Sequence, residues 1–174
     1  MIDVITIISE ETPKHWVGES IRSVKVAADF ADGVNIIHSD GVKNHIGKAV
    51  SNSLKKSTAE YICFVDDDDM VLPNAFRVME KHIPNQPSTV FAREFHLLSN
   101  GRIRIPNRRH HLAMYHRDIL SSISFEEHAV NIPVLMIEAA EKEEDVYDEM
   151  SWVYIYRIYR SKAMAIRSMQ KIDK

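Results

Sequence analysis

The sequence is poor in several kinds of residue, and each shortage excludes a class of protein. One cysteine, Cys63, in 174 residues excludes a disulfide framework and a zinc site built from cysteines. Only five glycines are present, and none forms a glycine-rich phosphate loop of the Walker type. No apolar run approaches the roughly 20 residues of a membrane span. A net charge of −3 argues against a protein that covers nucleic acid with its whole surface.

The remaining composition is that of one globular domain. Hydrophobic residues make up 45% of the chain and charged residues 27%, which is the balance of a soluble, well-packed protein. The amino terminus has no basic cluster, and Asp3 interrupts its apolar run, so we expect neither a signal peptide nor an anchor. The sequence therefore predicts a single compact domain over residues 1–174 in a cytoplasmic protein.

The first half of the chain alternates two kinds of hydrophobic pattern. Short β-branched runs predict buried strands, and apolar residues at helical spacing predict helices between them. We expect strands at 4–8, 34–37 and 61–65 and helices at 15–30 and 47–57. Strands that alternate with helices favour right-handed crossovers and a mostly parallel sheet with helices on its faces.

The second half has weaker patterns. Ser99-Asn-Gly101 is typical of a hairpin turn and predicts a β-ribbon over 96–105. Other elements are expected from periodicity alone: helices at 74–82 and 133–144, and strands at 88–92 and 152–159.

Four consecutive aspartates, Asp66 to Asp69, follow the third predicted strand directly. Acidic runs are usually solvated surface, but apolar residues on both sides of this one force several carboxylates into a small volume, where they repel one another. A bound cation offsets that repulsion. Alternate residues of an extended chain project to the same side, so we expect Asp66 and Asp68 to face one ion and Asp67 to point away. Carboxylate oxygens suit Mg²⁺ or Mn²⁺.

The position of the aspartates strengthens the prediction of a ligand site. In open α/β sheets, ligands bind outside the carboxyl ends of the strands. The first predicted strand ends at Ser9 and the second at Asp40, so both ends should meet the aspartates in one crevice. Asp40 also fits a plain turn, because Asp-Gly is a common turn pair.

These motifs resemble the family 2 glycosyltransferases of the GT-A, nucleotide-diphospho-sugar transferase fold. Members carry an Asp-Asp-Gly-Ser-like turn after one strand and Asp-x-Asp-Asp, followed by proline, after the next. This chain has Val34-Asn-Ile-Ile-His-Ser-Asp-Gly41 and Ala59-Glu-Tyr-Ile-Cys-Phe-Val-Asp-Asp-Asp-Asp-Met-Val-Leu-Pro73. The resemblance implies a Rossmann-like three-layer α/β sandwich, with a nucleotide-sugar-binding half at 1–92 and an acceptor half at 93–174.

The resemblance also implies roles for individual residues. Asp66 is expected near the ribose or the metal, and Asp68 as a ligand of Mn²⁺ or Mg²⁺. Asp40 is expected to contact the nucleobase, and Ser9 and Glu11 to touch the nucleotide. These assignments predict a donor that is a nucleotide-diphosphate sugar, with a UDP-sugar as the first candidate.

One feature of the family is missing. Its Ala-Arg-Asn motif, expected near residues 50–51, has no arginine here. Lys48 or Lys43 is left to neutralise the diphosphate, and the choice of nucleotide stays open.

Transfer with inversion needs a base for the acceptor hydroxyl, which in this family belongs to a Glu-Asp pair before a helix. Glu127, and after it Glu126, precedes the predicted helix at 133–144, and the strand after that helix resembles the family's late Tyr-x-Tyr-Arg segment. The plainer interpretation is that Glu126 and Glu127 only stabilise the start of this helix, where the helix dipole favours negative charge. Glu144-Asp145 is a literal Glu-Asp pair, but too little chain separates it from the following strand.

Residues 95–117 hold five arginines, four histidines and no acidic residue. Arg108, Arg109 and His111 are expected to bind an acceptor, either a glycan or a lipid-linked sugar. Hydroxylated bases of DNA, as in a bacteriophage, are the alternative acceptor, and a solvated loop is the plainer interpretation. Two other functions stay open: a phosphoryl-transfer enzyme, and a non-catalytic module that binds glycans or nucleotide sugars. A homo-oligomer is compatible with every one of these.

Overall fold

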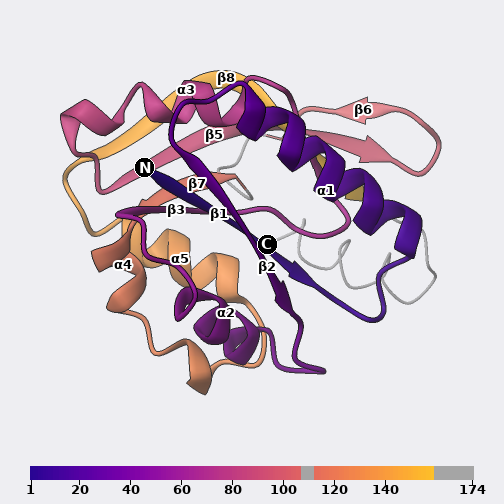
Figure 1. The fold of residues 1–174 in the computed structure, drawn as a ribbon, viewed down its shortest axis with the longest axis horizontal. Helices are drawn as coiled ribbons and strands as arrows, with labels where there is room; N and C mark the ends of the chain where they lie inside the picture. The colour runs from indigo at the N-terminus through magenta and orange to yellow at the C-terminus, as the bar shows by residue number, and fades with distance from the viewer. Residues whose placement is uncertain (107–111, 159–174) are drawn as a thin grey trace.

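The computed structural model describes residues 1–106 and 112–158, which form one sheet covered by helices on both faces (Figure 1). The strand order is β2-β1-β3-β7-β5-β8-β4, with β6 paired to β5. The predicted layered α/β architecture is confirmed. The strands are β1 (Ile2–Ile8), β2 (Val34–Asp40), β3 (Tyr61–Phe64), β4 (Met70–Val71), β5 (Thr89–Leu98), β6 (Ile103–Arg104), β7 (Ala113–His116) and β8 (Val146–Ile158).

Five α-helices and two short 3-10 turns cover the sheet in the described part of the chain. They are α1 (Lys14–Asp29), α2 (Ile46–Leu54), α3 (Ala75–Glu80), η1 (Ile83–Asn85), α4 (Arg117–Ser121), η2 (Phe125–Glu127) and α5 (Ile132–Ala140). Across residues 1–106 and 112–158, none of the helices has the length and apolar character needed to cross a membrane.

The first three strands pair in parallel, as the sequence predicts. Strand β1 lies between β2 and β3, and Ile2 of β1 is the register partner of both Val34 and Tyr61. Helices α1 and α2 connect these strands. The carboxyl ends of β1, β2 and β3 therefore lie at one edge of the sheet.

The second half of the chain extends the same sheet. Strand β7 is antiparallel to both β3 and β5, and Met114 of β7 pairs with Cys63 on one side and Val90 on the other. Strand β5 consequently runs in the direction of β3 and continues beyond its end. It then forms the predicted ribbon with β6, in which His96 pairs with Arg104.

Two features of this half differ from the sequence prediction. Helix α5 ends at Ala140 instead of continuing to residue 144, because residues 141–145 are all charged and all exposed. Strand β8 begins at Val146, six residues before the predicted start, because it pairs in parallel with nearly the whole of β5. Tyr159, the predicted end of that strand, lies outside the described residues.

Two hydrophobic cores lie on the two faces of the sheet. Neighbouring residues of β1 contribute to opposite cores, Val4 to the core under α1 and α3 and Ile5 to the core under α2, α4 and α5. Cys63 is fully buried in the first core, where burial raises the pKa of its thiol. We interpret it as a packing residue.

A buried carboxylate fixes the start of β3. Asp3 accepts hydrogen bonds from Ser57 Oγ at 2.6 Å, Thr58 N at 2.8 Å, Ala59 N at 2.9 Å and Asn35 Nδ2 at 3.0 Å. Burial pushes the pKa of Asp3 upward, but these bonds outweigh it, so the pKa lies below its ordinary value. The loop before β3 is thereby held against β1.

Replacing Gly47 with alanine is expected to destabilise the fold by about 3 kcal/mol, because a β-carbon there overpacks the contact between α2 and η2. Such an atom would lie 2.0 Å from the carbonyl oxygen of Phe125 and 2.1 Å from that of His128, and backbone cannot move aside cheaply. Urea denaturation measures the change. Gly18→Ala in α1 is the matched control, since only a flexible Arg22 atom lies near, at 3.6 Å; it should stabilise the protein by about 0.5–1 kcal/mol. Equal effects of the two substitutions would contradict this packing.

Candidate metal and nucleotide site

The four aspartates form a tight turn between β3 and β4, at the carboxyl edge of the parallel strands. The backbone N–H of Asp69 donates to the carbonyl of Asp66 at 3.2 Å. Side-chain oxygens of Asp66, Asp68 and Asp69 all lie within 4.8 Å of one another. The described residues contain no other cluster of three or more potential metal ligands with this geometry. Three oxygen ligands so close together match the preference of hard divalent cations.

Asp67 points away from the cluster, as predicted, although the run forms a turn and not the extended chain on which that prediction was based. Its Oδ2 accepts from the backbone N–H of Ser9 at 2.7 Å, and its Oδ1 accepts from Thr12 Oγ1 at 3.0 Å. Its carboxylate therefore ties the acidic turn to the end of β1. The same contact brings Ser9, one of the predicted nucleotide-binding residues, to the turn.

Strand β8 braces the turn from the other side. Asp69 is fully buried, and its carboxylate accepts from the Tyr154 hydroxyl at 2.8 Å and from the backbone N–H of Arg157 at 2.7 Å. The Tyr154 hydroxyl also accepts from Asp66 N at 3.3 Å. Sequence reasoning assigned no role at the site to Tyr154 or Arg157. Their one signal was the Tyr-x-Tyr-Arg pattern, which the resemblance placed in a late strand.

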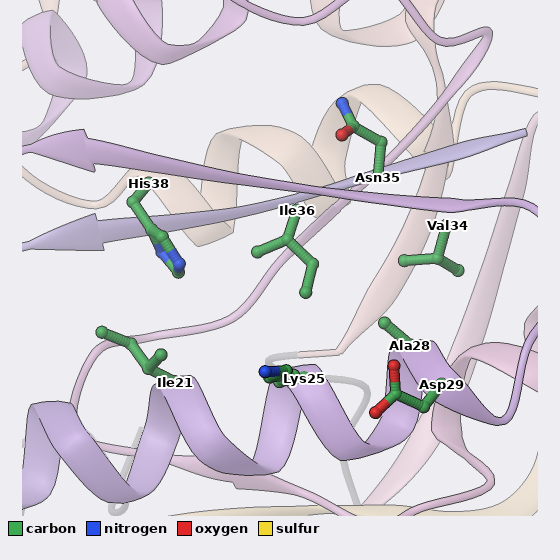
Figure 2. A pocket seen from close by; sticks show the side chains of 8 residues that line it. All are labelled: Ile21, Lys25, Ala28, Asp29, Val34, Asn35, Ile36 and His38. Carbon is green, nitrogen blue, oxygen red and sulfur yellow. The ribbon is translucent and has the colours of Figure 1, made fainter.

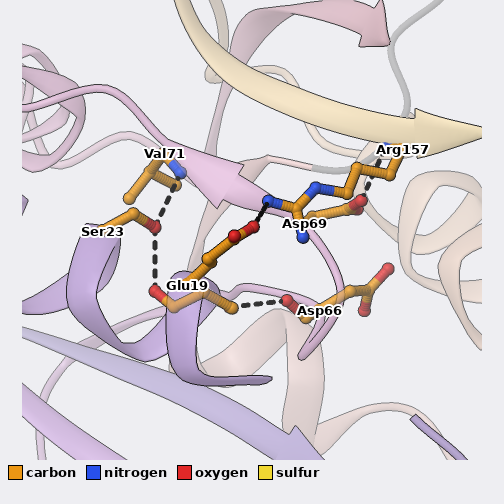
Figure 3. A network of polar contacts seen from close by, with 7 residues as sticks. Glu19, Ser23, Asp66, Asp69, Val71 and Arg157 are labelled. Carbon is orange, nitrogen blue, oxygen red and sulfur yellow. Dashed lines mark hydrogen bonds and ion pairs between the residues drawn. The ribbon is translucent and has the colours of Figure 1, made fainter. Parts of the chain in front are cut away.

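Helix α1 supports the turn and the strand that follows it. Ser20 Oγ donates to the carbonyl of Asp66 at 2.9 Å. Ser23 Oγ accepts from the backbone N–H of Val71 in β4 at 3.1 Å (Figure 3). Figure 3 also shows Glu19 of α1 reaching toward Arg157 of β8. The acidic turn is thus held by β1, β8 and α1 together.

The electrostatics of the turn favour a bound cation. Burial, and then the charges of Asp66 and Asp67, raise the pKa of Asp68 to about 6. Burial, and then Asp66 and Asp68, raise the pKa of Asp69 well above its ordinary value. Arg157 lowers the pKa of Asp68 but offsets only part of this rise. A divalent ion would favour the ionised form of every carboxylate in the cluster.

The other predicted nucleotide-binding residues lie exposed around the same edge or on α2. Asp40 is the last residue of β2 and pairs with Ile8 at the end of β1. Glu11 is exposed, and its backbone N–H donates to Ser9 Oγ at 3.2 Å. Lys48 is exposed in the first turn of α2.

The predicted bases lie against α2. Glu126, in η2, accepts from Ser51 Oγ at 2.8 Å and from Lys55 Nζ at 3.2 Å, and these bonds hold its pKa below the ordinary value. Glu127 is exposed in the same turn. Helix α5 begins at Ile132 and has no acidic residue in its first turn. None of the contacts of Glu126 joins η2 to the acidic turn.

The predicted acceptor residues Arg108, Arg109 and His111 lie outside the described residues. They come immediately before β7, the strand between β3 and β5. The other predicted pair, Glu144 and Asp145, is exposed in the loop before β8, where the Asp145 carbonyl accepts from Ser88 N at 2.9 Å.

Two cavities lie along the sheet, and no residue of the acidic turn lines either of them. One, of about 460 Å³, lies between α1 and the edge strand β2 and is lined by Ile21, Lys25, Ala28, Asp29, Val34, Asn35, Ile36 and His38 (Figure 2). The other, of about 520 Å³, follows β5 and β8, and its lining includes Arg93, Glu94 and Pro106. Pro106 directly precedes the segment that holds the predicted acceptor residues.

An acidic turn of this kind, at the carboxyl edge of a Rossmann-like sheet, has the ligands and the position to hold a divalent cation beside a bound nucleotide. The family model for glycosyl transferase family 2 matches residues 18–137. The chain belongs to this family, and the resemblance seen in the sequence is confirmed.

Solved structures agree with this assignment. Residues 1–349 of S. aureus TarS superpose with a TM-score of 0.71 at 13% identity, over 90% of this chain and 60% of that one. The UDP complex of the same TarS fragment gives a TM-score of 0.68, also at 13% identity and with the same coverage. The UDP-GlcNAc complex gives 0.66 at 13% identity, over 94% of this chain and 60% of that one.

These similarities show the fold, and the predicted GT-A fold is confirmed. The chain spans 36% of a longer TarS structure and 60% of the fragment. No curated protein matches the chain in sequence.

Proposed function

We propose that this protein transfers a sugar from a nucleoside-diphosphate donor to an acceptor hydroxyl, with Mn²⁺ or Mg²⁺ held by Asp66 and Asp68. The observation that carries the proposal is the convergence of three carboxylates at the ends of the parallel strands in a family 2 chain. The TarS complexes with UDP and UDP-GlcNAc support a uridine nucleotide as the donor.

Each part of the acidic turn has its own task in this proposal. Asp66 and Asp68 bind the ion, with Asp69 held beside them by Tyr154. Asp67 keeps the turn against β1. When bound, the ion supplies Lewis-acid neutralisation of the charge that develops on the departing diphosphate.

The residues along the strand ends bind the nucleoside in this proposal. Asp40 contacts the base at the end of β2, while Ser9 and Glu11 contact the nucleotide after β1. Lys48 faces the phosphates from the start of α2. Residues 1–92 would thereby form the donor half of a single domain.

The acceptor half, 93–174, binds a glycan or a lipid-linked sugar. The cavity along β5 and β8 supports this assignment, because Arg93 and Glu94 line it and the Arg108-Arg109 segment follows Pro106. Trp152 also lines this cavity: its ring stacks on Phe95 with the ring centroids 5.0 Å apart, and the Arg93 guanidinium carbon lies 5.3 Å from the centroid of the Trp152 ring. For inverting transfer we keep Glu127 as the proposed base, with Glu126 second.

A donor panel without acceptor tests the proposal. We expect slow release of a nucleoside diphosphate from one nucleotide sugar, only when Mn²⁺ or Mg²⁺ is present, because water substitutes for the acceptor. Chromatography of the nucleotide products measures it. Asp118→Asn in α4 is a matched control, since that side chain is 87% exposed and should keep full activity. If a donor is bound but none is hydrolysed with either ion, the chain is a binding module and not a transferase. If no donor is bound, the proposed function is wrong.

A further inference from the structure

Arg157 is a buried cation beside the acidic turn, and only part of the hydrogen-bonding capacity of its guanidinium is satisfied. The side chain is 8% exposed, and its Nη2 donates to Glu19 Oε2 of α1 (Figure 3). Its Nη1 is buried and has no hydrogen-bond partner among the described residues. The backbone N–H of Arg157 already donates to Asp69. The guanidinium is therefore fixed at one nitrogen and unsatisfied at the other.

An unsatisfied buried donor is costly, since it has lost water without gaining a partner. A ligand that accepts a hydrogen bond from Nη1 would explain why this donor is left without a partner in the protein. The backbone of Arg157 is bonded to Asp69, and Figure 3 shows the guanidinium beside that residue, so it lies close to the carboxylate cluster. An anionic group that binds at the cluster through a metal ion would come within reach of Nη1.

Binding of the donor's diphosphate also needs cationic side chains, and the sequence lacks one that the family resemblance leads us to expect. The family's Ala-Arg-Asn arginine is missing, and Lys48, the residue expected to replace it, is exposed on α2. Asp68, Asp69 and Glu19 bring three carboxylates close to Arg157. A diphosphate cannot approach that concentration of negative charge without cations to meet it.

We propose that Glu19 is a positioning residue for donor binding, which holds the Arg157 guanidinium so that Nη1 donates to an anionic oxygen of the donor's diphosphate. This inference rests on the proposed function. The planar guanidinium suits the task, because two of its nitrogens donate in fixed directions, one to Glu19 and one to the ligand. Helix α1 thus contributes to donor binding without touching the donor.

The test compares UDP with uridine, at saturating Mn²⁺, in the full chain. Arg157→Gln should weaken UDP binding about 10- to 100-fold, as expected for a charge-assisted hydrogen bond, and leave uridine binding unchanged. Calorimetry measures UDP, and ligand-observed NMR measures uridine. Arg117→Gln is the matched control: that arginine also donates to the protein, at Ser57 Oγ and the Ala59 carbonyl, but at the opposite edge of the sheet. It should lower stability without changing the ratio of UDP to uridine affinity.

Two substitutions at Glu19 separate positioning from charge. Glu19→Gln keeps an acceptor for Nη2 and should hold UDP affinity within about threefold. Glu19→Leu removes the acceptor and should weaken UDP binding about tenfold, again without effect on uridine. UDP binding by Arg157→Gln or Glu19→Leu at the wild-type level would overturn the inference, and so would an equal loss of UDP and uridine. Failure of the wild-type protein to bind UDP or any other nucleoside diphosphate with Mn²⁺ would instead refute the proposed function.

Discussion

The Asp68→Ala variant is expected to lose Mn²⁺-dependent binding of UDP, with a fall in affinity of at least about 100-fold. The Asp68 carboxylate is one of three whose oxygens lie within 4.8 Å of one another, and it is only partly buried, so it can reach an ion at the mouth of the cluster. Asp69 is the poorer ligand, since it is fully buried and both of its carboxylate oxygens already accept a hydrogen bond from β8. Titration calorimetry with and without Mn²⁺ measures the loss.

Asp67→Asn is the informative comparison for Asp68→Ala, because Asp67 belongs to the same run but binds Ser9 and Thr12. An asparagine keeps one oxygen acceptor for the backbone of Ser9. This variant should retain metal-dependent binding, within about tenfold of wild type. If Asp67→Asn loses metal dependence while Asp68→Ala keeps it, the division of the run into ligands and anchor is wrong.

The metal-free protein is expected to be less stable than its Asp68→Asn variant at neutral pH, and this difference should grow as the pH rises. The Asp68 carboxyl has an ordinary pKa of 3.8 and a pKa of about 6 in the folded protein. Below pH 3.8 the group is protonated in both states and folding incurs no penalty. Between 3.8 and 6 the unfolded chain releases the proton while the folded chain holds it, so stability falls. Above pH 6 the loss levels off at about 3 kcal/mol.

Urea denaturation of the two proteins at several pH values measures this difference. It should be near zero at pH 4 and about 3 kcal/mol in favour of Asp68→Asn at pH 7. Mn²⁺ binds the folded wild-type chain and should reverse the order at pH 7. A difference that is independent of pH, or a wild-type protein that is the more stable one without metal, would show that burial and the neighbouring carboxylates do not disfavour the ionised form of Asp68 in the fold.

The sequence predicts the parallel half of the sheet well, and the reason is local. Dense β-branched runs separated by helical periodicity leave few arrangements, and the right-handed crossover rule favours parallel strands with helices on the faces of the sheet. The position of the acidic run at the end of a strand follows from the same reasoning. These signals lie within a few residues of one another along the chain. The grouping of its side chains does not follow from alternation in an extended chain, because the run forms a turn in which Asp69 joins Asp66 and Asp68.

The supports of the cluster depend on contacts between distant residues, which local patterns do not show. Tyr154 and Arg157 reach the aspartates because β8 returns to pair with β4, a strand of two residues that carries no periodic signal. Glu19 was one charge among several on an exposed helix. Only the fold shows that it faces Arg157.

The least predictable part is the region of the proposed base. The sequence contains acids before a predicted helix, but the helix begins at Ile132 and its first turn has none. Glu126 instead pairs with Lys55, seventy-one residues away in the sequence. The family pattern predicts only the order of the acids, the helix and the strand along the chain. The positions of Glu126 and Glu127 in space depend on the packing of η2 against α2.

A crystal of the protein grown with Mn²⁺ and UDP tests the central claim most directly. Anomalous scattering should locate one manganese ion about 2.1–2.3 Å from carboxylate oxygens of Asp66 and Asp68, with the diphosphate of UDP as a further ligand. A well-ordered UDP with no manganese at the acidic turn, or manganese bound only elsewhere on the chain, would contradict the account.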